Sequence, residues 1–337
     1  MTSKERLDAF YAGEPVDRLP NLTIVGSVVT RYNGIDIEQY SKDPIAMADA
    51  AILAAKDLEL DFVQIASDLT REAEGYGSVI EYFADELPRV GTYALGDIHE
   101  VENLKPLKAR EIPRLFDLVT ATEYALKKEP DIWPMTLAVG PMTVAGNIRG
   151  VEMLMMDLFD APELVDKLLD IATETTLDLI RELAAVGAKY MYVADPVASL
   201  MGPAFYQTSV LRCHKRIFDE MKAHGIQGRL HMCGDTTAIL PFSRDCGAVI
   251  IDIDHATDYA AALAAVEGHC ILSGNIDPVS EVFSCDAETT KKALHACHDA
   301  ACGCRALFMP GCELPTKTPI ENVKAIAAVL AEIGAVK

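Results

Sequence analysis

Apolar residues fall into two alternating patterns along the chain. Short apolar runs, typical of buried strands, occupy residues 21–25, 61–66, 134–139, 189–194, 228–232, 248–251, 269–273 and 305–309. Longer stretches with apolar residues at helical spacing occupy residues 44–58, 115–128, 144–158, 162–186, 203–224, 236–245, 259–266, 287–301 and 319–333. Eight strands that alternate with helices predict an α/β fold. They favour a (β/α)8 TIM barrel over a doubly wound open sheet, which would give a similar pattern.

One segment interrupts this alternation. Residues 75–111 contain SVIEYFADELPRVGTYALGD, which predicts an inserted β-hairpin. The amphipathic stretch KERLDAFYAGEPVDRLP precedes the first strand and predicts an N-terminal helical extension. No stretch has the composition of a linker, so we expect residues 1–337 to form a single barrel domain.

Polar side chains gather where the predicted strands end. In (β/α)8 barrels the loops after the strands meet at one mouth and carry the active site. These positions hold Asp68, the turn VGPMT with Met142, Asp195, His231, Cys233, Asp252, Asp254, Asn275, Asp277 and Cys312. The pattern therefore predicts an active-site rim.

Composition and charge exclude several kinds of partner. The formal net charge of -21 argues against nucleic acid or an anionic membrane surface, because both would be repelled. The N-terminus lacks the apolar core of a secretory signal, and no run of about 18 apolar residues occurs. All nine cysteines follow residue 212, which suits free thiols in a reducing compartment. We therefore expect a cytoplasmic protein; its oligomeric state is left open.

The sequence RLHMCGD places two metal-binding residue types next to a predicted strand end. His231 and Cys233 are separated by one residue, so both side chains lean to one side of an extended chain, and Cys312 follows the last strand. One nitrogen and two sulfur ligands favour zinc, and three protein ligands leave a place for a substrate. A thiol bound there loses its proton, so the pattern indicates alkyl transfer to sulfur. Asp254, with Asp252 as competitor, is the expected fourth ligand.

Two other interpretations of these residue types stay open. The cysteines could belong to the core, with the histidine satisfied by a backbone carbonyl. A second cluster, in HACHDAACGCRALF, contains His295, Cys297, His298, Cys302 and Cys304. It precedes the last strand, at the far end of the barrel from the predicted site, so we expect its members to pack or to face solvent.

Three segments resemble a known family. RLHMCGDTTAIL, SGNIDP and MPGCELPTKTPIENVKAI resemble the uroporphyrinogen decarboxylase superfamily, and the likeness runs through essentially the whole chain. The His-x-Cys pair with a distant cysteine resembles its corrinoid-dependent branch, the methylcobamide:coenzyme M methyltransferases. This resemblance implies a (β/α)8 barrel in one-carbon metabolism, with zinc bound by His231, Cys233 and Cys312. It also implies methylcobalamin on a separate corrinoid-binding protein as methyl donor and a small-molecule thiol, such as coenzyme M, as acceptor.

The same resemblance suggests roles for further residues and leaves more than one function open. Asp68 and Asp195 are expected to contact substrate or corrinoid, and Asn275, Asp277 and Met142 to bind the corrinoid. Asp68 also matches the catalytic aspartate of the decarboxylases, but the stretch LPNLTIVGSVVTRYNG offers one arginine, Arg31, to grip several substrate carboxylates. Besides decarboxylation, the chain could transfer the methyl group to a non-thiol acceptor such as tetrahydrofolate. It could also be a non-catalytic protein that handles corrinoids or binds a metal.

Overall fold

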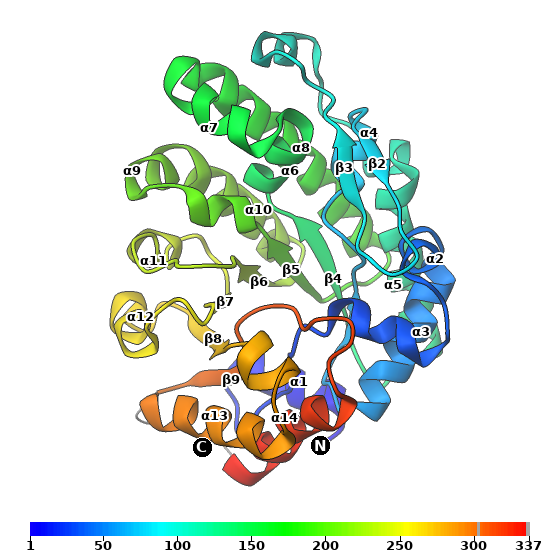
Figure 1. The fold of residues 1–337 in the computed structure, drawn as a ribbon, viewed down its shortest axis with the longest axis vertical. Coiled ribbons are helices and arrows are strands. Elements are labelled where there is room, and N and C mark those ends of the chain that lie inside the picture. Colours follow the sequence, from blue (N-terminus) through cyan, green and yellow to red (C-terminus); the bar gives the residue numbers. More distant parts are fainter. Residues whose placement is uncertain (302–303, 335–337) are drawn as a thin grey trace.

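The computed structural model describes residues 1–301 and 304–334. Within them, seven parallel strands form one curled sheet in the order β1-β4-β5-β6-β7-β8-β9 (Figure 1). The strands are β1 (Val63–Ile65), β4 (Pro134–Val139), β5 (Tyr190–Ala194), β6 (Gln227–His231), β7 (Ile250–Asp252), β8 (Ile271–Ile276) and β9 (Ala306–Pro310). Almost all their residues are buried, as in parallel sheets that are covered by helices on the outside and filled by side chains within.

The helices surround the sheet (Figure 1). The outer layer consists of α3 (Pro44–Asp57), α5 (Pro113–Lys128), α8 (Pro162–Ala185), α10 (Leu211–Ala223), α11 (Leu240–Ser243), α12 (Tyr259–Val266), α13 (Ala287–Ala300) and α14 (Ile320–Ile333). Shorter elements are α2 (Ile37–Lys42), α4 (Arg71–Gly75), α6 (Pro141–Arg149), α7 (Val151–Asp160), α9 (Pro203–Phe205) and the turns Pro196–Leu200, Tyr206–Val210 and Val279–Phe283. The strand–helix alternation predicted from the apolar pattern is confirmed over most of the chain.

The expected first strand differs from the prediction. Residues 21–25 pair with no neighbour as a strand, and a 3-10 helix, Gly26–Tyr32, follows. The segment lies between β1 and the loop after β9, because Asn21 O accepts from Asp61 N and Ile24 O accepts from Leu314 N. Gln64 Oε1 accepts a hydrogen bond from Val25 N at 3.0 Å. A side-chain amide therefore takes the place of the backbone carbonyl that a neighbouring strand would supply. The described residues thus contain seven paired strands, and a closed eight-stranded barrel stays a prediction.

The inserted hairpin lies at the carboxyl ends of the parallel strands (Figure 1). Strand β2 (Val79–Glu81) pairs antiparallel with β3 (Arg89–Thr92), and two 3-10 turns, Ile98–Asn103 and Ala109–Glu111, complete the segment. Ser78 Oγ donates to the carbonyl of residue 147 at 2.9 Å, which ties the base of the hairpin to α6.

At the opposite end of the sheet, the predicted N-terminal helix is α1 (Ser3–Ala12). Arg6 on this helix pairs with the buried Asp61 at 2.6 Å, and Asp8 accepts from the hydroxyl of Tyr190 at the start of β5. None of the helices within the described residues combines the length and apolar composition that crossing a bilayer requires.

Two predicted helices are divided in the structure. The stretch 144–158 forms α6 and α7, which separate at Gly150, whose φ of 91° ends the first helix. The stretch 203–224 contains a π-helical turn between α9 and α10.

In the second cysteine cluster Cys297 is buried and Cys304 is exposed, as expected for packing and surface residues, while Cys302 lies outside the described residues.

Candidate metal centre

Three residues from distant parts of the chain converge at the carboxyl end of the sheet. His231 is the last residue of β6, Cys233 follows two positions later, and Cys312 lies two residues beyond β9. The Cys233 Sγ lies 3.2 Å from His231 Nε2 and 3.1 Å from Cys312 Sγ. The third separation, from Cys312 Sγ to His231 Nε2, is 3.7 Å. The sequence predicted this convergence, and the structure brings all three ligand atoms within 4.8 Å of one another.

The size and chemistry of this triangle fit zinc. With ordinary Zn–S and Zn–N bonds, tetrahedral ligands stand roughly 3.5–3.8 Å apart. The observed separations are close to these values, so a small movement of the side chains suffices to coordinate the ion. One imidazole and two sulfurs form a borderline-soft donor set, and the fourth tetrahedral position is left for a ligand from the cavity.

A buried carboxylate orients the histidine. Asp252 Oδ2, at the end of β7, lies 2.9 Å from His231 Nδ1, which leaves Nε2 directed at the sulfurs. Both Asp252 oxygens accept from Arg229 Nε, at 2.8 and 2.9 Å. Carboxylate–histidine pairs of this kind fix the tautomer and raise the basicity of metal-binding imidazoles. Asp252 therefore orients the His231 ring and is not one of the three residues grouped around a possible ion.

Hydrogen bonds within the triangle favour a protonated His231 and an ionised Cys312. Burial disfavours the cationic form of His231, but the hydrogen bonds and charges of Asp252 and Cys312 outweigh it and raise the pKa of His231 to about 10. Hydrogen bonding from Cys233 and from His231 lowers the pKa of Cys312, and the same sharing raises the pKa of Cys233. An ion that binds here takes the place of protons held between these three groups.

Asp254, the expected fourth ligand, does not join the triangle. Its Oδ2 accepts from Gly234 N at 2.7 Å, and its Oδ1 accepts from His255 N at 2.7 Å. The group of residues that share a possible ion consists of His231, Cys233 and Cys312. Asp254 instead holds the loop after β6 in place, because it fastens the backbone next to Cys233. Its role as ligand stays a prediction that this geometry does not favour.

The triangle lines a cavity of about 480 Å3. Its lining also contains Gln64, Tyr192 and Glu313, together with residues of the β2–β3 hairpin. Glu313 packs against Gly26, where a Cβ would lie 1.8 Å from the Glu313 carboxylate and where φ is +49°. Burial raises the pKa of Glu313 to about 7. The sequence offered few signals for these residues, apart from the position of Glu313 directly after Cys312.

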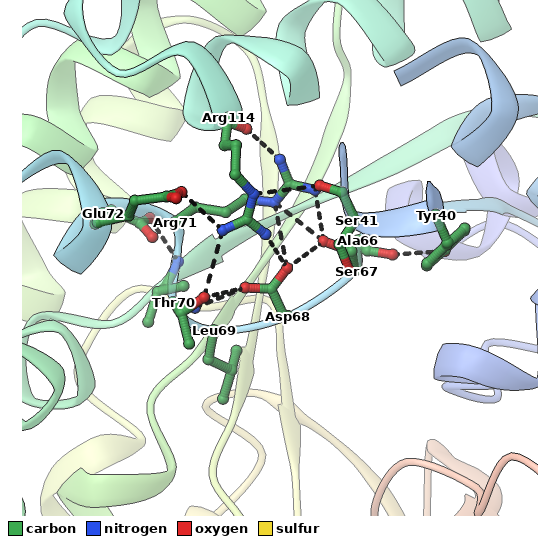
Figure 2. Close-up of polar contacts among 12 residues, drawn as sticks. Tyr40, Ser41, Ala66, Ser67, Asp68, Leu69, Thr70, Arg71, Glu72 and Arg114 are labelled. Carbon is green, nitrogen blue, oxygen red and sulfur yellow. Dashed lines mark hydrogen bonds and ion pairs between the residues drawn. The ribbon is translucent and has the colours of Figure 1, made fainter. Parts of the chain in front are cut away.

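Asp68 also lines the cavity, but its carboxylate is fully engaged (Figure 2). Its Oδ1 accepts from the N–H and hydroxyl of Thr70 at 2.9 and 2.6 Å, and its Oδ2 accepts from Ser67 Oγ and from Arg114. Arg71 lies 3.9 Å away. Burial opposes ionisation, yet the two guanidinium groups outweigh it and lower the pKa of Asp68. These contacts occupy both carboxylate oxygens, and contact between Asp68 and a substrate stays a prediction.

The structure gives Asp195 a structural environment. It is completely buried, and its Oδ1 accepts from the N–H and hydroxyl of Thr143 at 2.7 Å each, which caps the first turn of α6 from a neighbouring strand end. His214 lies 3.0 Å from its Oδ2. A Cβ at Gly140 would come within 2.2 Å of Asp195, so glycine is needed there. Asp195 is absent from the described residues that line the cavity, so contact with substrate stays an unsupported prediction.

The three expected corrinoid ligands lie apart from the cavity lining among the described residues. Met142 is buried in α6. The amide of Asn275 donates to the carbonyl of Thr257 at 2.6 Å, and Asp277 accepts from Val279 N and Ser280 Oγ. These contacts assign local roles to Asn275 and Asp277, while corrinoid binding by these residues stays a prediction.

Comparison with known families agrees with this geometry. The family model described as uroporphyrinogen decarboxylase (URO-D) matches residues 2–333, so the chain belongs to this family. Among its relatives, the methylcobamide:CoM methyltransferase MtbA of Methanosarcina acetivorans is 28% identical over 334 residues, covering 96% of each chain. A uroporphyrinogen decarboxylase of Thermus thermophilus is 24% identical and covers 90% of this chain and 88% of its own.

A solved structure shares the fold. A methyltransferase from Methanosarcina mazei superimposes with a TM-score of 0.85 at 24% identity, covering 99% of both chains. The prediction that the protein is a methyltransferase, in the branch with the methylcobamide-dependent relatives, is confirmed by these comparisons.

Proposed function

We propose that this protein transfers a methyl group from a methylated corrinoid to a thiol acceptor, at a zinc ion bound by His231, Cys233 and Cys312. The observation that carries the proposal is the meeting of one imidazole nitrogen and two sulfurs on the wall of a cavity. The relatives named methylcobamide:CoM methyltransferases support the donor and the kind of acceptor. When bound, zinc lowers the pKa of a coordinated thiol and keeps it as a thiolate near neutral pH.

The side chains of this chain position the reaction. Asp252 holds His231 with Nε2 toward the sulfurs, and Arg229 holds Asp252. The cavity has room for a small thiol, and Ile24 and Leu137 contribute apolar surface to its lining. The acceptor sulfur attacks the methyl carbon, a sulfur–carbon bond forms, and the cobalt–carbon bond breaks. The bonding pair stays on cobalt, which passes from Co(III) to Co(I).

Several finer points belong to the same proposal. The acceptor is coenzyme M or a similar small thiol, and homocysteine and tetrahydrofolate are the competing acceptors to be assayed. A separate corrinoid-binding protein delivers the donor. Free cysteines throughout the described part of the chain suit a reducing compartment such as the cytoplasm. The engaged state of Asp68 weighs against decarboxylation, because a catalytic carboxylate needs a free oxygen toward its substrate.

Metal analysis combined with a methylcobalamin assay tests the proposal. The purified protein should contain one zinc per chain and should demethylate methylcobalamin when coenzyme M is added, which is followed by the change in the cobalamin spectrum. Cys312→Ala should lose both zinc and turnover. The matched control is Cys304→Ala, which removes an exposed thiol and should preserve both.

Three outcomes would count against this function. Full activity in Cys312→Ala would show that the triangle has no part in the reaction. Consumption of uroporphyrinogen without added metal would favour the decarboxylase. Binding of methylcobalamin without transfer to any thiol or to tetrahydrofolate would indicate a corrinoid-handling protein.

A further inference from the structure

The β2–β3 hairpin forms one side of the cavity mouth. Leu87, Val90 and Tyr93 line the cavity, yet the exposed fractions of Leu87 and Tyr93 are 38% and 47%. Apolar side chains grouped at the edge of a cavity are typical of ligand-binding surfaces. Their position indicates that a ligand with apolar surface covers them when the site is occupied.

The cavity can hold the thiol acceptor but not the corrinoid donor. A space of about 480 Å3 is of the size that holds a small organic molecule. A complete corrinoid, with its macrocycle, peripheral amides and nucleotide loop, is too large to enter this space. The donor therefore has to stay at the mouth and direct its methyl group inward, toward a thiol held at the triangle. Whatever forms the mouth must then contact the corrin ring.

The hairpin is held firmly enough to serve as a platform. Tyr82 donates its hydroxyl to Glu74 at 2.8 Å, and the carbonyl of Ala84 accepts from Ile37 N at 2.9 Å. On the other side, the ring of Tyr93 packs against Gly150, where a Cβ would lie only 3.1 Å from the ring. These contacts fix Tyr93 between the hairpin and the start of α7. The Tyr93 ring is thus held in place before a ligand arrives, which lowers the entropic cost of binding.

The chemistry of the hairpin residues suits a corrinoid better than a charged ligand. A corrin ring presents broad apolar faces and neutral amides. Among the described residues that line the cavity, the hairpin contributes one charged side chain, Arg89, and this already pairs with Glu81 at 3.1 Å. Apolar and aromatic contacts from Leu87 and Tyr93 match such a ring face without leaving a charge unpaired.

We propose that Leu87 and Tyr93 form a lip on which the corrin ring of the methyl donor rests during transfer. The lip rests on the proposed function, since it names the surface that receives that donor. It adds a second surface to the one that the sequence suggested, because Asn275, Asp277 and Met142 are not among the described residues that line the cavity.

Binding and turnover with free methylcobalamin test the lip. The variants are Leu87→Ser and Tyr93→Ser, and the matched control is Val79→Ser, which removes a 58% exposed apolar side chain from the same hairpin outside the cavity lining. Each lip variant should raise the Kd for methylcobalamin, measured by calorimetry, by about tenfold, the usual cost of losing a central apolar anchor. The KM for coenzyme M, the zinc content and the melting temperature should stay at wild-type values, and Val79→Ser should bind like wild type.

The possible results separate the lip from the function on which it rests. Wild-type methylcobalamin affinity in both lip variants, or an equal loss in Val79→Ser, would overturn the lip and leave the methyltransferase proposal intact. If methylcobalamin binding depends on Leu87 and Tyr93 but the protein transfers no methyl group, the lip is supported and the proposed function is refuted. A wild-type protein with no affinity for methylcobalamin would refute the lip directly.

Discussion

Replacing Asp252 by asparagine removes the negative charge that links His231 to Arg229. In the structure the Asp252 oxygens lie 2.9 Å from His231 Nδ1 and 2.8 and 2.9 Å from Arg229 Nε. Both Asp252 and Arg229 are almost completely buried. The amide of asparagine keeps one acceptor oxygen but turns its NH2 group toward one of the two donors. One hydrogen bond is therefore lost, and a buried guanidinium loses its counterion.

Two separate magnitudes follow from this geometry. The metal site should weaken by about 10- to 100-fold, because that is the usual effect of removing the carboxylate behind a metal-binding histidine. The metal-free fold should lose about 3–5 kcal/mol of its free energy of unfolding, because a buried pair broken on one side leaves an uncompensated charge. The hydrogen bonds from Arg229 to the carbonyl of Leu22 and toward Met309 Sδ replace only part of this stabilisation.

Two assays measure these effects independently. Competition with a chromogenic chelator gives the zinc affinity of the folded protein. Urea unfolding in excess chelator gives the stability without the contribution of bound zinc. The control variant Glu38→Gln removes a surface pair with Lys42, whose partners are 46% and 44% exposed. It should leave the zinc affinity unchanged and shift the unfolding free energy by at most about 0.5 kcal/mol. Wild-type zinc affinity in Asp252→Asn would refute the orienting role of this carboxylate.

Two further predictions concern buried carboxylates outside the metal centre. Burial raises the pKa of Glu72 from 4.5 to about 7, so the folded chain keeps a proton that the unfolded chain releases, and stability falls as the pH rises through this interval. The stability of Glu72→Gln relative to wild type should therefore rise by about 3 kcal/mol from pH 4.5 to pH 8 in urea titrations, and a difference independent of pH would contradict the assignment. Asp195→Ala should lose about 3 kcal/mol of unfolding free energy, since the N–H of Thr143 and the ring of His214 lose their partner. It should still bind zinc fully, whereas an unchanged stability with lost methylcobalamin binding would restore Asp195 as a substrate contact.

The amino-acid sequence by itself determined the parts of this protein that depend on local pattern. The apolar pattern located most of the sheet and its helical cover, because a strand buried on both faces forms a short apolar run and a helix buried on one face repeats apolar residues at helical spacing. The residues proposed as metal ligands could be found in the sequence for a related reason. His231 and Cys233 alternate along an extended strand end, and parallel strands bring their carboxyl ends to one edge, where Cys312 also lies.

Tertiary structure alone decided which polar groups serve the site and which serve the fold. Asp252, Asp254 and Asp195 all lie at or just beyond the end of a strand, yet the first orients His231, the second holds a loop and the third caps a helix. The sequence pattern likewise indicates neither the hydrogen bond between Val25 N and the Gln64 side chain nor the position of Tyr93 at the cavity mouth. The physical reason is that a carboxylate or an aromatic ring takes its role from the partners within about 3 Å of it. Those partners lie many residues away in the chain, so a sequence pattern does not specify them.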